Sequence, residues 1–209
     1  MSDRINTLLT RFPELSEASK DIELATEKII SCYKNGGKVL LCGNGGSAAD
    51  CTHIVGELMK GFLKRRPTDQ KALEILKSKG ADDELIAKLQ CALPAINLCE
   101  SSALITAYCN DVDPEYIFAQ QVYGLGKKGY VLIGLSTSGN AKNVNHAAKI
   151  AKALDMTVIG MTGKMGGKLS QNADICIKAP HTETYRIQEY HLPIYHFICA
   201  LIEDAFFEN

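Results

Sequence analysis

The chain has 209 residues, a formal net charge of −1 and 46% hydrophobic residues, which is enough apolar material for one substantial core. The near-neutral charge leaves no basic excess to attract the phosphates of nucleic acid. No apolar run approaches the roughly 20 residues that span a bilayer. We therefore expect one domain that binds neither nucleic acid nor a membrane.

The eight cysteines are scattered along the chain, several of them in apolar runs, and none has the spacing of a zinc ribbon. Free thiols are typical of a reducing compartment. The N-terminus is an amphipathic segment rather than a signal sequence. These features predict a cytoplasmic protein.

Helical spacing and apolar runs alternate along the chain. In order, the pattern predicts a helical N-terminal segment over about 1–35, a strand at about 38–43, a helix to about 64, two short charged helices broken at Gly80 within about 68–92, a strand near 95–98, helices at 102–109 and 114–125, a strand at 131–135, a helix to about 154, strands at 157–161 and 175–177, and a helix over about 183–207. This alternation indicates an α/β fold, with a parallel sheet covered by helices on both faces. Ligands in such folds bind at the carboxyl ends of the strands.

A glycine-rich turn, 43–47, follows the first predicted strand and opens a helix. Glycines let the backbone approach a ligand closely, and a helix N-terminus offers N–H groups to an anion. His53 and Glu57 are four residues apart on that helix, so both side chains lie on one face. The segment predicts an anion-binding turn beside a pair of proton-handling or metal-binding groups.

A second turn, 136–140, follows the strand at 131–135 and carries three hydroxyls, those of Ser136, Thr137 and Ser138. Such donors before a helix suit phosphate oxygens, whereas ordinary helix capping needs only one of them. We favour the phosphate-binding interpretation over capping. A P-loop and a dinucleotide motif are both missing.

The C-terminal helix places Gln188 and His196 in an otherwise apolar pattern, with Pro193 expected to kink it. The two residues are about 12 Å apart along the axis at 1.5 Å per residue. A lone histidine on such a helix is more often a core residue than a catalyst. His191 and His146 are weaker candidates still.

The order of these motifs resembles the phosphoheptose isomerases (sedoheptulose 7-phosphate isomerases) of the sugar isomerase (SIS) domain superfamily. The resemblance rests on Gly43-Asn44-Gly45-Gly46-Ser47, His53 with Glu57, Asn110-Asp111, Ser136 to Asn140, Thr162-Gly163 with Gly166-Gly167, and Arg186 to Glu189 with His196. It implies a single SIS domain over 1–209, built as a three-layer αβα sandwich around a five-stranded parallel sheet with flavodoxin-like topology. It also implies a homotetramer with its active sites at subunit interfaces.

The resemblance further implies roles for particular residues. Glu57 would be the general base of an aldose–ketose isomerisation and His196 its partner acid or base. The sugar phosphate would contact Asn44, Gly45, Gly46, Ser47, Asn110, Asp111, Ser136, Thr137, Ser138 and Gln188. One zinc ion per subunit would be held by His53, Glu57, Gln188 and His196. The 12 Å offset along the helix favours a site shared between subunits, because Gln188 and His196 otherwise converge only from either side of the ion.

Three departures from the family pattern bear on the substrate. Ala141 stands where the family usually has serine, and Lys60-Gly61 stands where it usually has a glycine–arginine pair. About 25 additional residues near 68–92 form an insertion, which we interpret as a solvated helical hairpin rather than a lid or an added subunit contact.

Three alternatives to phosphoheptose isomerisation remain. One is a non-catalytic SIS-domain regulator that binds a replication initiator, but that branch tends to lack the catalytic Glu or His that this chain keeps at Glu57 and His196. Another is a sugar-phosphate sensor, which is usually fused to a DNA-binding module that has no counterpart here. The third is an isomerase for another sugar phosphate, which Ala141 and the insertion keep open.

Overall fold

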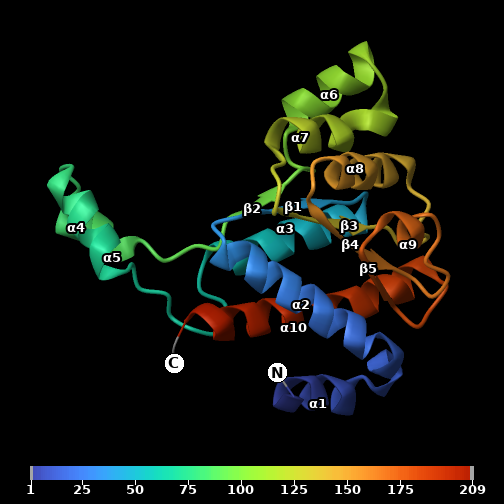
Figure 1. Cartoon of the computed structure of the whole chain (residues 1–209), viewed down its shortest axis with the longest axis horizontal. Helices are drawn as coiled ribbons and strands as arrows, with labels where there is room; N and C mark the ends of the chain where they lie inside the picture. Colours follow the sequence, from blue (N-terminus) through green and yellow to red (C-terminus); the bar gives the residue numbers. More distant parts are fainter. Residues whose placement is uncertain (1, 208–209) are drawn as a thin grey trace.

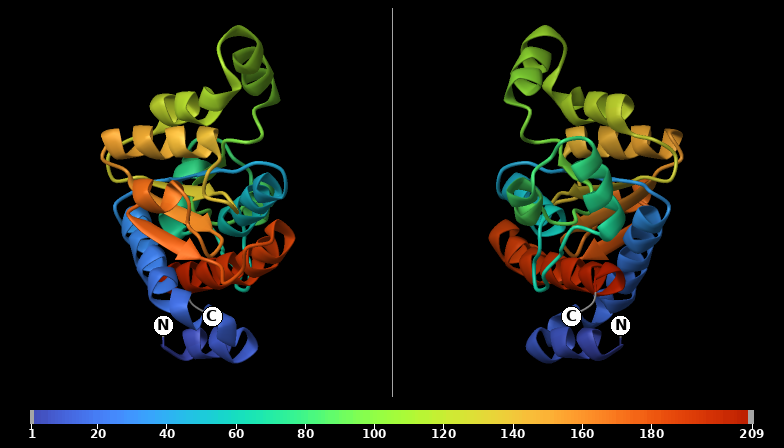
Figure 2. Two further views of the ribbon diagram at one scale, coloured as in Figure 1. Left: turned by 90° about the vertical axis from the view of Figure 1, so that its right-hand side faces the viewer. Right: turned by 90° about the vertical axis from the view of Figure 1, so that its left-hand side faces the viewer.

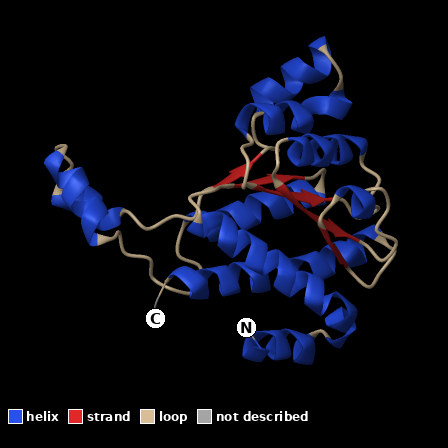
Figure 3. Ribbon diagram, viewed as in Figure 1, coloured by secondary structure: helices blue, strands red, loops and turns tan. Residues whose placement is uncertain are grey.

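The computed structural model describes residues 2–207, and one parallel sheet organises this part of the chain (Figure 3). Its spatial order is β2 (Ala95–Asn97), β1 (Val39–Cys42), β3 (Val131–Leu135), β4 (Thr157–Thr162) and β5 (Ile175–Lys178). Every neighbouring pair is parallel. The order 2-1-3-4-5 is that of flavodoxin-like folds, so the predicted five-stranded sheet and its topology are confirmed.

Helices cover both faces of the sheet (Figures 1 and 2). Figure 1 has α2 (Ser19–Lys34), α3 (Gly46–Met59) and α10 (Thr184–Phe206) below the strands, and α7 (Ile117–Leu125) and α8 (Lys142–Ala153) above them. The remaining helical elements are α1 (Ser2–Arg11), η1 (Pro13–Ala18), α4 (Gln70–Ser78), α5 (Asp83–Lys88), α6 (Ser102–Asp111), η2 (Pro114–Tyr116) and α9 (Leu169–Asn172). The arrangement is the expected three-layer sandwich.

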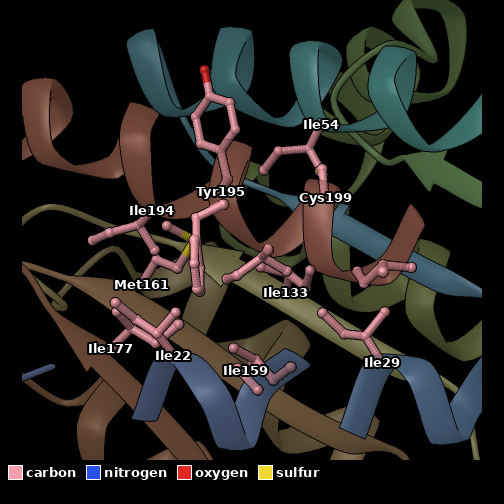
Figure 4. Close-up of a cluster of buried hydrophobic side chains, with 14 of the residues drawn as sticks. Ile22, Ile29, Ile54, Ile133, Ile159, Met161, Ile177, Ile194, Tyr195 and Cys199 are labelled. Atoms are coloured by element: carbon pink, nitrogen blue, oxygen red, sulfur yellow. The ribbon is translucent and has the colours of Figure 1, made fainter. Parts of the chain in front are cut away.

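The two faces of the sheet bury two separate hydrophobic clusters. Leu41 and Ile133 face the first cluster, which α2, α3 and α10 complete (Figure 4). The neighbouring Leu40 and Leu132 face the second, together with residues of α7 and α8. Successive strand side chains point to opposite faces, so a strand covered on both sides must be apolar throughout. This explains the uninterrupted apolar runs in the sequence.

The insertion forms the hairpin of α4 and α5, with Gly80 between them at a φ of +93°. The hairpin stands away from the sheet in Figure 1, and α4 contributes no buried residue. α6 likewise buries none of its residues and lies at the top of the view, above α7. Among residues 2–207, no helix combines the length and the apolar character needed to cross a membrane.

A buried ion pair fixes the end of α3 against α10. The Arg66 Nε donates to Glu203 Oε1 at 2.8 Å, and the two side chains are 0% and 1% exposed. The other guanidinium nitrogens of Arg66 donate to the carbonyls of Leu58 and Glu57, at 2.7 and 2.9 Å. These carbonyls lack helical partners because α3 ends at Met59. Arg66 therefore caps the helix that carries His53 and Glu57.

Candidate active site

The glycine turn and the hydroxyl turn lie next to each other at the carboxyl edge of the sheet. The glycine turn (43–47) follows β1 and the hydroxyl turn (136–140) follows β3, and these two strands are paired. Chain connections leave β1 and β3 in opposite directions across the sheet, which is the switch point where ligands bind in such folds. The structure therefore brings the two predicted binding segments into one place.

The glycine turn is shaped for close approach. Gly45 has a φ of +56° and precedes the first residue of α3, Gly46. A Cβ at Gly46 would overlap the amide group of Gln188, so only glycine lets α10 bring this amide against the turn. Ser47 is buried in the first turn of α3, whereas Asn44 is exposed.

A reciprocal pair of amides joins the two turns. Asn44 Nδ2 donates to Asn143 Oδ1 at 3.0 Å, and Asn143 Nδ2 donates back to Asn44 Oδ1 at 2.9 Å. Asn143 lies in the first turn of α8, directly after the hydroxyl turn. The pair fixes the orientation of the Asn44 side chain relative to the hydroxyls of 136–138.

Part of the hydroxyl turn serves its own backbone. The Ser136 and Ser138 hydroxyl oxygens accept from the N–H groups of Ala141 and Asn140, at 3.4 and 3.1 Å. Both capping and phosphate binding are thus open to these two hydroxyls. The Thr137 hydroxyl and the backbone N–H groups of Thr137 and Ser138 have no partner among the described residues. These free donors suit an anion.

Two imidazoles and a carboxylate meet where α3 and α10 pack together. His53 Nε2 lies 3.1 Å from Glu57 Oε1 and 3.4 Å from His196 Nε2. One ligand atom from each of the three residues falls within 4.8 Å of the others. Glu57 Oε2 is buried and has no hydrogen-bond partner among residues 2–207, and the exposed Lys60 ammonium lies 3.6 Å from it. Glu57 Oε2 therefore has free lone pairs, which a proton, a cation or a substrate hydroxyl would satisfy.

The electrostatics of the cluster favour a neutral His196. Burial lowers the pKa of the His196 imidazole below its usual range, and the neighbouring His53 lowers it further, against an opposing effect of Glu57. A neutral imidazole keeps a free lone pair, which proton transfer and metal coordination both require.

A tyrosine and an aspartate support the cluster from behind. The Tyr195 hydroxyl lies 3.0 Å from His53 Nδ1 and donates to Asp50 Oδ1 at 3.4 Å. Burial, with the adjacent Asp50 carboxylate adding to it, raises the pKa of Tyr195 far above its usual range, so the phenol stays protonated. Burial also raises the pKa of the Asp50 carboxyl, although hydrogen bonding from Tyr195 and the nearby His53 oppose this.

Comparisons with known proteins identify the family. Two family models, both described as SIS domain, match residues 2–90 and 103–196. The phosphoheptose isomerase of Aneurinibacillus thermoaerophilus is 40% identical over 188 residues, which cover 90% of this chain and 83% of that protein. The chain belongs to the phosphoheptose isomerase family.

Two solved structures support the same family assignment. A phosphoheptose isomerase from Francisella tularensis has a TM-score of 0.75 at 31% identity, covering 97% of both chains. The phosphoheptose isomerase of Neisseria gonorrhoeae has a TM-score of 0.70 at 33% identity, covering 95% of this chain and 98% of that one. Membership in the phosphoheptose isomerase family makes the chain an aldose–ketose isomerase by class.

The structure brings together most, but not all, of the residues that the phosphoheptose isomerase pattern predicts. Gln188 lies at the glycine turn and His196 lies at His53 within the same protomer. Their separation of about 12 Å along α10 is matched by about 10 Å between Gly46 and His53 along α3. α10 therefore runs beside α3 and contacts it at two separate points, so the Gln188 amide and the His196 imidazole do not meet at one point of α3 within a protomer.

Asn110 and Asp111 are the predicted residues that one protomer does not bring to the site. They end α6, where the Asn110 amide donates to Asp111 Oδ1 at 2.8 Å. Both side chains are exposed, and α6 packs mainly on η2 and α7 rather than on the glycine turn. Within a single protomer, the expected contact of these two residues with the sugar site is therefore missing.

Sequence reasoning missed three residues that contact predicted site residues: Asp50, Asn143 and Tyr195. Asp50 is three residues before His53 on α3, and this helical spacing was a usable signal. Asn143 and Tyr195 meet their partners only across the fold, so no local pattern marked them.

Proposed function

We propose that this chain is a phosphoheptose isomerase that interconverts sedoheptulose 7-phosphate and D-glycero-D-manno-heptose 7-phosphate. The observation that carries the proposal is the Glu57 carboxylate beside two imidazoles, at the sheet edge that bears the hydroxyl turn; among the described residues its buried Oε2 has no hydrogen-bond partner. A non-catalytic regulator has no use for such a carboxylate. We therefore do not favour that alternative or a sugar-phosphate sensor.

The Glu57 carboxylate acts as the base of the isomerisation. It removes the proton from the carbon next to the ketose carbonyl, and the electron pair of that C–H bond forms the enediol as the carbonyl oxygen gains a proton. Glu57 then returns a proton to the former carbonyl carbon while the hydroxyl on the deprotonated carbon loses its proton and becomes the aldehyde, which gives the aldose. His196 moves protons to and from the substrate oxygens, for which a neutral imidazole is suited.

The hydroxyl turn holds the phosphate of the substrate. The Thr137 hydroxyl and the free N–H groups of Thr137 and Ser138 supply donors at the start of α8, with the Ser136 and Ser138 hydroxyls beside them. Asn44, Gly45, Gly46, Ser47 and Gln188 line the sugar end of the site.

A zinc ion, one per subunit, fits the donor set. His53, Glu57 and His196 offer two imidazoles and a carboxylate within ligand distance of one another. Gln188 is the further ligand that the family pattern implies, but within the same protomer its amide lies at Gly46 in the glycine turn. When bound, zinc supplies a Lewis acid that polarises substrate oxygens and orders the site. The buried Glu57 Oε2, which accepts no hydrogen bond from the described residues, supports this assignment.

The protein acts as a cytoplasmic homotetramer in this proposal. Asn110 and Asp111 are exposed at the end of α6, away from the glycine turn of their own protomer. In the tetramer they would contact the sugar site of a neighbouring subunit. All eight cysteines, each within the described residues, are free thiols, as a reducing cytoplasm requires. Analytical ultracentrifugation tests the assembly, and a monomer with full activity would refute it.

The decisive experiment incubates the protein with a panel of ketose phosphates in D₂O. We expect aldose formation and deuterium at the carbon next to the carbonyl with sedoheptulose 7-phosphate, and neither in Glu57→Gln. Turnover of a different ketose phosphate in preference would correct the substrate and keep the reaction class. Unimpaired turnover by Glu57→Gln would remove the proposed base.

A further inference from the structure

Tyr195 joins α10 to two residues of α3 through a single hydroxyl. The hydroxyl oxygen lies 3.0 Å from His53 Nδ1 and 3.4 Å from Asp50 Oδ1. Asp50 and His53 are three residues apart, so both face α10 from the same side of α3. Figure 4 shows the Tyr195 ring leaving the buried cluster, with its hydroxyl oxygen pointing away from the other labelled side chains.

The position of the ring leaves the hydroxyl little freedom. Tyr195 is 2% exposed, and its ring packs edge-on against His53 with centroids 5.5 Å apart. The ring also contacts His196 edge-on at 4.9 Å. The contact between hydroxyl and imidazole is therefore built into the packing of α3 on α10.

Counting protons restricts the directions that these hydrogen bonds can take. A tyrosine hydroxyl carries one proton, and a carboxylate only accepts. Among the described residues, Tyr195 supplies the hydrogen bond to the Asp50 carboxylate, at Oδ1, while Oδ2 is buried without a partner. With its proton given to Asp50, the Tyr195 oxygen can only accept from His53, and this contact requires the imidazole proton on Nδ1. A proton on Nε2 would instead be donated to Glu57 Oε1, 3.1 Å away, so Tyr195 and Glu57 compete for the single proton of a neutral His53.

We propose that Tyr195, held by Asp50, is a positioning residue that keeps the His53 proton on Nδ1 and so turns the Nε2 lone pair toward Glu57 and His196. The opposite arrangement, with Tyr195 donating to His53, leaves the buried Asp50 carboxylate facing a lone pair. It also leaves the imidazole proton on Nε2, where it is donated to Glu57 Oε1 and occupies the position that a cation would need. The hydrogen-bond chain from Asp50 to His53 thus prepares one ligand of the cluster before any ion arrives.

The inference rests on the proposed function, because it concerns the same site, but its test does not need turnover. The first variant is Tyr195→Phe, which removes only the hydroxyl. Its matched control is Tyr190→Phe, since Tyr190 lies five residues earlier on α10 and its hydroxyl has no partner among the described residues. A second variant, Asp50→Ala, removes the other end of the chain.

The first measurement is nitrogen NMR of the histidine side chains, with and without added zinc. We expect His53 of the wild type and of Tyr190→Phe to carry its proton on Nδ1. In Tyr195→Phe and Asp50→Ala we expect a shift toward the Nε2-protonated form. An unchanged tautomer in both variants would overturn the proposal.

The second measurement is the dissociation constant for Zn²⁺, by competition with a chromophoric chelator. Loss of such a supporting hydrogen bond typically weakens binding about 10–100-fold. We expect that loss in each single variant, and no further loss in the Tyr195→Phe, Asp50→Ala double variant, because both act through one proton. Additive losses would show two independent effects and refute the chain.

Isomerase kinetics separate this inference from the proposed function. Here we expect Tyr195→Phe to lower kcat with little change in KM, because the hydroxyl does not touch the substrate. A wild-type protein that turns over no sugar phosphate, yet shows the tautomer and zinc differences, would refute the function and keep the inference. If Tyr195→Phe does not fold, Asp50→Ala carries the same NMR and zinc tests.

Discussion

Replacing Glu203 by glutamine should be among the most destabilising polar changes in this protein. The carboxylate accepts from the backbone N–H groups of Phe62, Leu63 and Lys64, at 2.8, 2.7 and 3.1 Å, in addition to its ion pair with Arg66. Burial raises the pKa of the Glu203 carboxyl, but these hydrogen bonds outweigh it and hold the pKa below its usual range. Both oxygens of the buried Glu203 carboxylate therefore accept hydrogen bonds.

The magnitude follows from what Glu203→Gln leaves behind. One carbonyl oxygen replaces two carboxylate oxygens, the new NH₂ faces donors, and the Arg66 charge stays buried without a counter-charge. Breaking such a pair from one side costs roughly 3–5 kcal/mol. We therefore expect the free energy of unfolding to fall by about 4 kcal/mol. Turnover should fall as well, because Arg66 caps the end of α3 at Glu57 and Leu58.

Urea unfolding at one fixed protein concentration measures the change, since assembly alters apparent stability. Asp204→Asn is the matched control. Its carboxylate is next in sequence and pairs with Arg4 and Lys64, but it is 29% exposed, so a loss of at most about 1 kcal/mol is expected. Equal losses in the two variants, or a loss below about 1 kcal/mol in Glu203→Gln, would refute the reasoning.

Three further changes test the site and the core. Gly46→Ala should displace the Gln188 amide and lower kcat/KM at least about tenfold, with the unfolding free energy within about 1 kcal/mol of wild type, because the helix start tolerates alanine; unchanged kinetics would mean that Gln188 is not used there. Thr137→Val should raise KM about tenfold without altering stability, since the hydroxyl has no partner among the described residues; an unaltered KM would leave the turn a simple cap. Burial lowers the pKa of His191 to about 4, and its Nε2 donates to the Thr162 carbonyl at 3.2 Å. Its neutral form is favoured in the fold, so stability is full above about pH 6.5, falls as the pH drops, and is reduced by about 3 kcal/mol near pH 4. His191→Gln keeps a donor and should flatten that slope in acid titrations monitored by circular dichroism, whereas an unaltered slope would contradict it.

Local sequence patterns were enough for the framework of the site. The apolar runs within about 38–43 and at 131–135 predicted buried strands, which the structure confirms as Val39–Cys42 and Val131–Leu135, and the turns after them predicted where a ligand binds. The spacing of His53 and Glu57 placed both side chains on one face of a helix, and their nitrogen and oxygen do lie 3.1 Å apart. Each of these features depends on residues a few positions apart, where backbone geometry fixes the relative placement of side chains.

The packing of α10 on α3 adds contacts between residues that are far apart in the sequence. It sets His196 against His53 across 143 positions, the Tyr195 hydroxyl between His53 and Asp50, and Glu203 against Arg66 across 137 positions. Such contacts depend on the relative rotation and position of two amphipathic helices packed on one sheet. Helical periodicity alone does not fix them, because many different residue pairs are compatible with the same period. The sequence by itself therefore determined the layers, the turns and the Glu57–His53 pair, while only the tertiary structure decided which distant side chains complete and hold them.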